Sequence, residues 1–236
     1  MDVRIVYYVL GRLVMAETVT MFIPFAMAVW NLETSIPGFA VALGLSASVG
    51  LVLQSHGRRR EKDLSIREGL AITGFGWAIA TSLGMLPYVC GGYLNALDAV
   101  FESISGFTGT GATVFDTLTG LPSSILFWRM MTHWFGGLGI IVIFIALLPQ
   151  TGQSTVLMYN AETTGPTEDR VLPRLRDMTK VLFKIYLLFT FTATAVYMLC
   201  GLTFYEAITH AMSTIGAGGF STYDESAMHF DSPTFE

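Results

Sequence analysis

The chain has 236 residues, of which 52% are hydrophobic and only 13% are charged. Ordinary globular domains carry about 25% charged residues, so this composition argues against a soluble domain, a disordered chain and a nucleic-acid binder. The formal net charge of -5 is mild, and two cysteines, Cys90 and Cys200, are too few and too distant for a metal cage or a disulfide framework. We therefore predict an all-α polytopic membrane protein.

Five apolar stretches are long enough to cross a bilayer core of about 30 Å, which takes about 20 helical residues. In chain order they cover residues 5–30, 39–53, 70–89, 125–148 and 181–199. Segment 91–124 is too polar and too rich in glycine to cross, although residues 96–107 are typical of a short helix. A second short helix is predicted at 203–213, again followed by glycine-rich chain. Short helices of about 10–14 residues at a membrane indicate re-entrant segments.

The basic residues predict the orientation, since Lys and Arg gather in cytoplasmic loops. Twelve of the thirteen basic residues lie near the N-terminus or in two clusters, at 58–67 and at 170–184, and Arg129 is the exception. The alternate loops carry acids but no Lys or Arg. We therefore expect a multi-pass protein of the plasma membrane (the inner membrane in a bacterium) with a cytoplasmic N-terminus. The cluster at 170–184 has two possible roles, attraction to lipid headgroups or docking of a regulatory subunit.

The two glycine-rich segments form an internal repeat. Segment 107–112 (FTGTGA) aligns with segment 214–219 (TIGAGG), and each follows a short helix that itself follows a spanning helix. The repeating unit is a span, a re-entrant helix, a glycine loop and a closing span. Both loops are expected to enter from the outer side, so the repeat is parallel.

Glycine loops of this kind suit cation passage. Non-helical backbone at membrane depth occurs where it is buried in protein or lines a water-filled path. Carbonyl oxygens of such a loop can replace the hydration shell of an alkali cation, and neither loop contains a Lys or Arg that would repel it. The alternative is that the glycines serve helix packing, an interpretation that we favour instead for Gly136, Gly137 and Gly139, where a bend is also possible.

These segments resemble the Trk/Ktr/HKT cation transporter superfamily, and its TrkH-type branch in particular. The resemblance rests on segments 103–113 (SISGFTGTGAT) and 134–141 (WFGGLGII), and on segments 210–215 (HAMSTI) and 218–222 (GGFST). It covers nearly the whole chain. It implies four helix–pore-loop–helix units around one pore, preceded in TrkH-type members by two further helices.

On this basis the chain divides into two N-terminal transmembrane helices (1–57), a first unit (64–149), a cytoplasmic loop (150–173) and an incomplete second unit (174–236). The resemblance also implies potassium import, a cytosolic nucleotide-binding regulatory subunit and a homodimer in contact with membrane lipid. Only half of a four-unit ring is present, so we expect either a fragment of a longer polypeptide or a pore completed by other chains.

The resemblance assigns the single filter glycine of each loop to Gly111 and Gly218. An additional glycine lies two positions earlier in each loop, at Gly109 and Gly216, so the glycine that faces the ion stays open. Some family members carry Ser at the first filter glycine and favour sodium, whereas glycine in both loops favours potassium. The candidate ion-binding residues are Thr108, Gly109, Thr110, Gly111, Ile215, Gly216, Ala217 and Gly218.

Arg129 is the candidate filter support, through pairing with Glu102 or Asp116, and the alternative is an interfacial arginine that reaches the headgroups. His133 and His210 are interpreted as packed histidines rather than pH sensors. Potassium is expected as substrate at backbone carbonyls, with no covalently bound cofactor, no transition-metal site and no enzymatic activity. The alternatives are a sodium-conducting member of the same superfamily or a secondary transporter with broken helices.

Overall fold

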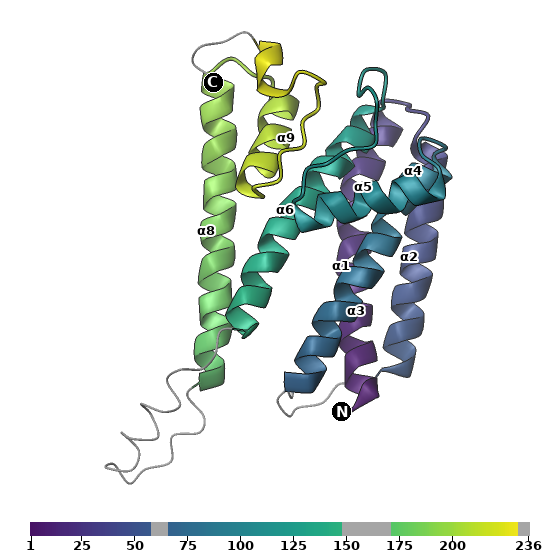
Figure 1. The fold of residues 1–236 in the computed structure, drawn as a ribbon, viewed down its shortest axis with the longest axis vertical. Helices are drawn as coiled ribbons and strands as arrows, with labels where there is room; N and C mark the ends of the chain where they lie inside the picture. Colours follow the sequence, from purple (N-terminus) through teal and green to yellow (C-terminus); the bar gives the residue numbers. More distant parts are fainter. Residues whose placement is uncertain (58–65, 148–170, 231–236) are drawn as a thin grey trace, which may run out of the picture.

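The computed structural model describes residues 1–57, 66–147 and 171–230, and over these ranges the chain is helical without strands. Figure 1 shows the arrangement. The elements, in chain order, are α1 (Val3–Trp30), α2 (Ile36–His56), α3 (Ile66–Gly84), α4 (Leu86–Cys90), α5 (Ala96–Thr108), α6 (Ser123–Leu147), α8 (Val171–Leu199), α9 (Phe204–Ile215) and the 3₁₀ helix η2 (Ser226–Phe230).

Four helical segments of the described residues are long and apolar enough to cross a membrane: Val3–Trp30, Ile36–His56, Arg67–Cys90 and Lys180–Leu199. They coincide with four of the five spans predicted from the sequence. The remaining predicted span, 125–148, is helical as α6 up to Leu147. The predicted cytoplasmic loop at 150–173 lies outside the described residues except for its last positions, where α8 has already begun.

The third span is broken near its C-terminal end. Helix α3 stops at Gly84, and α4 starts again at Leu86 with Pro87 in its first turn. Proline has no backbone N–H and its ring clashes with the preceding turn, so it is tolerated at the start of a helix but not inside one. The break therefore separates a long helix from a single turn that leads into α5.

The core lies where the N-terminal helices of the chain meet the N-terminal half of α6. Met21 of α1, Phe39 of α2, Tyr88 of α4 and the α6 residues Ile125 and Trp128 are fully buried there. The Trp128 indole Nε1 donates a hydrogen bond of 2.9 Å to the carbonyl of Gly84, which lies at the end of α3. This bond fixes α6 against the broken span.

The two short helices lie in the half of the molecule away from the N-terminus (Figure 1). Helix α5 packs against α6 and α3, and α9 packs against α8 and α6. Helix α6 is therefore the element that both short helices share, and it crosses the view diagonally between the α1–α3 group and α8 (Figure 1).

Candidate functional site

Helix α5 leads directly into the first glycine loop, which we define as residues 109–122. The side chain of Asn95 caps the start of α5 by accepting hydrogen bonds from the amides of Leu97 and Asp98. The helix ends at Gly109, which has a φ of +70°. This is the left-handed cap with which many helices terminate, and glycine adopts it without a steric penalty.

Helix α9 leads into the second glycine loop, residues 216–225. A capping box closes its start, because Thr203 accepts from the amide of Glu206 while the Glu206 side chain accepts from that of Thr203. At its end, Gly216 keeps a right-handed φ of -70°, and Ala217 takes the left-handed conformation with a φ of +52°. The helical turn therefore runs one position further than the glycine pattern predicts.

This difference corrects the register of the repeat. The helix caps of the two copies coincide when the second copy is shifted by one position relative to the sequence alignment. This shifted register pairs Gly109 with Ala217 and Gly111 with Gly219. Gly111 and Gly219 both have positive φ, of +76° and +87°. The sequence alignment paired Gly109 with Gly216, and therefore Gly111 with Gly218, because it matched glycines. The backbone conformations of Gly109 and Gly216 differ, since their φ angles are +70° and -70°.

Hydrogen bonds beyond the caps repeat in the corrected register. In the first loop the amide of Phe115 donates to the Thr113 hydroxyl at 3.2 Å. In the second, the amide of Tyr223 donates to the Ser221 hydroxyl at 3.0 Å. These two hydrogen bonds relate the loops by the same register as the helix caps do. The corrected register adds Gly219 to the candidate ion-binding residues, and the sequence had not indicated this residue.

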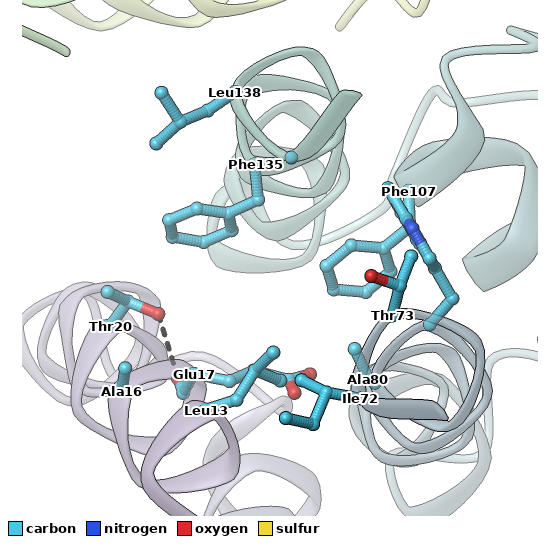
Figure 2. A pocket seen from close by; sticks show the side chains of 13 residues that line it. Leu13, Ala16, Glu17, Thr20, Ile72, Thr73, Ala80, Phe107, Phe135 and Leu138 are labelled. Atoms are coloured by element: carbon cyan, nitrogen blue, oxygen red, sulfur yellow. Dashed lines mark hydrogen bonds between the residues drawn. The ribbon is translucent and has the colours of Figure 1, made fainter. Parts of the chain in front are cut away.

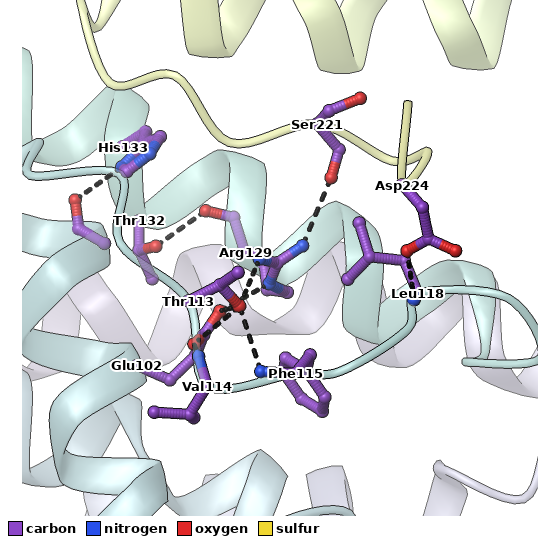
Figure 3. Close-up of polar contacts among 11 residues, drawn as sticks. Glu102, Thr113, Val114, Phe115, Leu118, Arg129, Thr132, His133, Ser221 and Asp224 are labelled. Carbon is purple, nitrogen blue, oxygen red and sulfur yellow. Dashed lines mark hydrogen bonds and ion pairs between the residues drawn. The ribbon is translucent and has the colours of Figure 1, made fainter. Parts of the chain in front are cut away.

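Arg129 of α6 lies between the two loops (Figure 3). Its Nε is 2.7 Å from Glu102 Oε1 of α5, and the two side chains are 1% and 0% exposed. One terminal nitrogen of Arg129 donates to the Thr113 hydroxyl in the first loop, and the other donates to the Ser221 carbonyl in the second, each at 3.2 Å. Glu102 also accepts from the amide of Val114 at 3.0 Å. Of the two carboxylates considered for Arg129, Glu102 makes the ion pair, whereas Asp116 is exposed.

Phe220 of the second loop lies between two side chains of α6. The Arg129 guanidinium carbon is 4.2 Å from the centre of the Phe220 ring, and the His133 ring stacks on it at 4.0 Å. His133 Nδ1 is 2.7 Å from the carbonyl oxygen of Gly106 in α5. His133 is therefore a packed histidine that contacts both short-helix units.

One face of α6 carries all of these contacts. Positions spaced by three or four residues lie on one side of a helix, and this spacing relates Arg129, Thr132, His133, Gly136 and Gly137. A Cβ atom at Gly136 would overlap the carbonyl of the last turn of α5, and one at Gly137 would lie 2.8 Å from the Cα of Gly216. Gly136 and Gly137 therefore serve close packing of backbones, the interpretation favoured from the sequence, whereas Gly139 faces the ring of Trp77.

The two loops also contact each other directly. A Cβ atom at Gly111 would overlap the carbonyl oxygen of Gly218, so only a glycine backbone fits at this approach. Thr108 and Thr110 are exposed, and their hydroxyl groups are 2.8 Å apart. Among the other candidates, Ile215 is half-buried and Gly216 is buried.

Asp224 joins the ends of the two loops. Its carboxylate accepts from the Leu118 amide at 2.6 Å and from the hydroxyls of Thr117 and Thr119 at 2.8 and 3.1 Å. These hydrogen bonds hold the pKa of Asp224 below its ordinary value, and the bond from the Leu118 amide has the largest effect. The carboxylate form is therefore the one that links the loops.

Replacing Asp224 with Asn is expected to loosen this link at neutral pH. Because the folded pKa is depressed, the stabilisation is present above the unfolded pKa of about 4 and is lost as the pH falls through the folded pKa. Hydrogen exchange at the Leu118 amide measures the link, and the ratio of variant to wild-type rates should exceed one at pH 7 and approach one in acid. Glu225→Gln removes an exposed neighbouring charge and is the control; an equal effect of both variants would contradict the assignment.

Comparison with known proteins adds family information to this geometry. Residues 37–236 match the model of the TrkH family, described as a cation transport protein. The chain is 36% identical to the Trk system potassium uptake protein TrkH of Halomonas elongata, over 100% of this chain and 50% of that protein. It is 38% identical to the protein of the same name from Escherichia coli, over 99% of this chain and 49% of that protein.

A solved structure is similar along the entire chain. The crystal structure of the potassium transporter TrkH from Vibrio parahaemolyticus superposes with a TM-score of 0.85 at 34% identity, covering 100% of this chain and 47% of that one. The chain thus spans about half the length of the curated relatives that it matches.

Proposed function

The chain belongs to the TrkH family of cation transport proteins, and from this we propose that it takes part in potassium uptake across the cell membrane. The ion passes through a pore to which each helix–re-entrant-loop–helix unit contributes one glycine loop, and four such units complete the pore. The observation that carries the proposal is the meeting of two equivalent glycine loops at the backbones of Gly111 and Gly218.

The electrostatics of the two loops favour a cation. Helices α5 and α9 both end at a glycine loop, and the C-terminal end of a helix carries partial negative charge. Neither loop contains a Lys or Arg. The nearby Arg129 is paired with Glu102, so its charge is compensated. These features support backbone carbonyls as the groups that replace the water around potassium.

We assign the filter to both loops together. The first loop contributes Thr108, Gly109, Thr110 and Gly111, and the second contributes Ile215, Gly216, Ala217 and Gly218 with the addition of Gly219. In this assignment Gly219, rather than Gly218, is the counterpart of Gly111, because both have positive φ. Arg129 and Glu102 support the filter by holding the two loops on α6.

The proposed topology follows the charge distribution of the sequence. The N-terminus and both basic clusters are cytoplasmic, and the glycine loops enter from outside. Residues 1–57 precede the first unit at 64–149, and residues 174–236 belong to the second unit. A cytosolic nucleotide-binding subunit and a second copy of the protein are the proposed partners, the basic region at 170–184 being available to the former.

Growth of a potassium-uptake-deficient strain on low potassium tests the function. Expression of the complete gene product is expected to restore growth on low potassium, and rubidium or potassium influx into the cells should rise with it. The influx should exceed sodium influx when measured in parallel. Absence of influx from cells in which the protein has reached the membrane would contradict the proposal, and sodium influx alone would favour the sodium-conducting alternative.

A further inference from the structure

A cavity of about 400 Å³ lies between α1, α3 and α6, apart from the glycine loops (Figure 2). Its walls are apolar for the most part and include the rings of Trp77, Phe107 and Phe135. Small-molecule sites in proteins usually have volumes of about 300–1,000 Å³ and combine apolar walls with a few polar groups. The size and lining of this cavity therefore suit a compact organic molecule.

Glu17 supplies the acidic group of this cavity. Its side chain is 8% exposed, and both carboxylate oxygens are buried without a hydrogen-bond partner among the described residues. Figure 2 shows the carboxylate extending from α1 towards α3. Glu17 lies near the middle of the 28-residue span α1. An acid without a partner at this depth carries a high free-energy cost, and such acids usually mark a binding site.

The residues around Glu17 favour a positively charged ligand. Within the described ranges, the lining contains one acid and no Lys or Arg. Aromatic rings attract organic cations through their faces, and this attraction is stronger when water is excluded. The carboxylate therefore provides a counter-charge for an ammonium group, and the three aromatic rings provide an apolar surface for the hydrocarbon attached to it.

We propose that this cavity binds a hydrophobic organic ammonium, with Glu17 as the counter-ion and the three rings around the hydrocarbon body. The midspan position of Glu17 favours a small free amine over a lipid headgroup, which resides at the membrane surface. Phe107 lies in the last turn of α5, just before Gly109. A ligand in the cavity therefore touches the helix that carries the first glycine loop.

Binding of 1-adamantylamine to the purified complete protein tests this site. The amine is expected to raise the midpoint of thermal unfolding by about 2–4 °C or more at saturation. The alcohol 1-adamantanol has the same hydrocarbon body without the positive charge, and its apparent affinity should be at least tenfold weaker. The readout requires no ion transport, so it is independent of the proposed uptake.

Three variants determine where the amine binds. Glu17→Gln keeps the shape of the side chain and should abolish the difference between amine and alcohol, whereas Glu225→Gln, a charge change at an exposed position, should retain it. Ala16→Phe fills the cavity from α1 while keeping Glu17, and it should reduce binding of both compounds. An absent amine shift, equal shifts with both compounds, or an amine-specific shift that persists in Glu17→Gln would overturn the proposal.

Discussion

Replacing Gly111 with alanine is expected to reduce potassium uptake by the complete protein at least tenfold, while the same change at Gly120 should leave uptake intact. Gly111 has a φ of +76°, and a Cβ atom there would overlap the Gly218 carbonyl oxygen. The left-handed conformation costs a non-glycine residue about 1–2 kcal/mol at either position, whereas the overpacking, which costs about 1–3 kcal/mol, arises only at Gly111 and acts on the contact between the loops. Since about 1.4 kcal/mol corresponds to a factor of ten, we expect uptake to fall by at least tenfold.

Gly120 is the matched control for Gly111. It lies in the same loop with a φ of +89°, but a Cβ atom there meets nothing within 4 Å. Gly120→Ala therefore introduces the same kind of backbone strain without the collision between the loops. Initial rates of rubidium influx, normalised to the amount of protein in the membrane, distinguish the two variants. Normal influx through Gly111→Ala would exclude Gly111 from the ion path.

Replacing Arg129 with methionine is expected to destabilise the protein and to stop uptake. The change leaves the buried Glu102 carboxylate without its cationic partner, and removal of one member of a buried ion pair costs about 3–5 kcal/mol. It also removes the hydrogen bonds to Thr113 and Ser221. Thermal unfolding of the purified complete protein should show a lower midpoint, and influx measurements should show little transport.

A double variant separates the unpaired charge from the loss of the arginine itself. Arg129→Met with Glu102→Leu should be more stable than Arg129→Met alone, because no buried charge is left unpaired. Arg129→Lys keeps the charge but cannot reproduce the planar fork of donors, so it should be intermediate. Asp116→Asn, at an exposed position, is the control. Equal stability of Arg129→Met and the double variant would contradict the unpaired Glu102 charge as the source of the lost stability.

The spans and the short helices were predictable because they depend on composition and length. Four apolar spans coincide with the prediction, and both short helices begin near the expected residues, at Ala96 and Phe204. The partner of Arg129 was narrowed to two carboxylates by the rule that intramembrane charges are paired. Sequence could not choose between Glu102 and Asp116, since the choice depends on the side of α5 that faces α6 and on the path of the first glycine loop.

The register of the two loops was not predictable from glycine positions alone. Gly216 keeps a right-handed φ as the cap residue of α9 and Ala217 adopts positive φ, so a glycine does not mark the same backbone conformation in both copies. Aligning the pairs Ser105/Ser213 and Asp116/Asp224 would have given the correct register. Glu17 was also missed, although an acid within a long apolar run is itself a signal.

The shared face of α6 has a mechanical consequence for the two glycine loops. Arg129, His133 and Gly137 connect the same rigid rod to both glycine loops, so neither loop can shift far without the other. A small rotation of α6, applied at the end of the helix that lies far from the loops, would be transmitted to both loops in one step. The two loops would therefore move as a single unit, without a stage in which one loop is displaced and the other is intact.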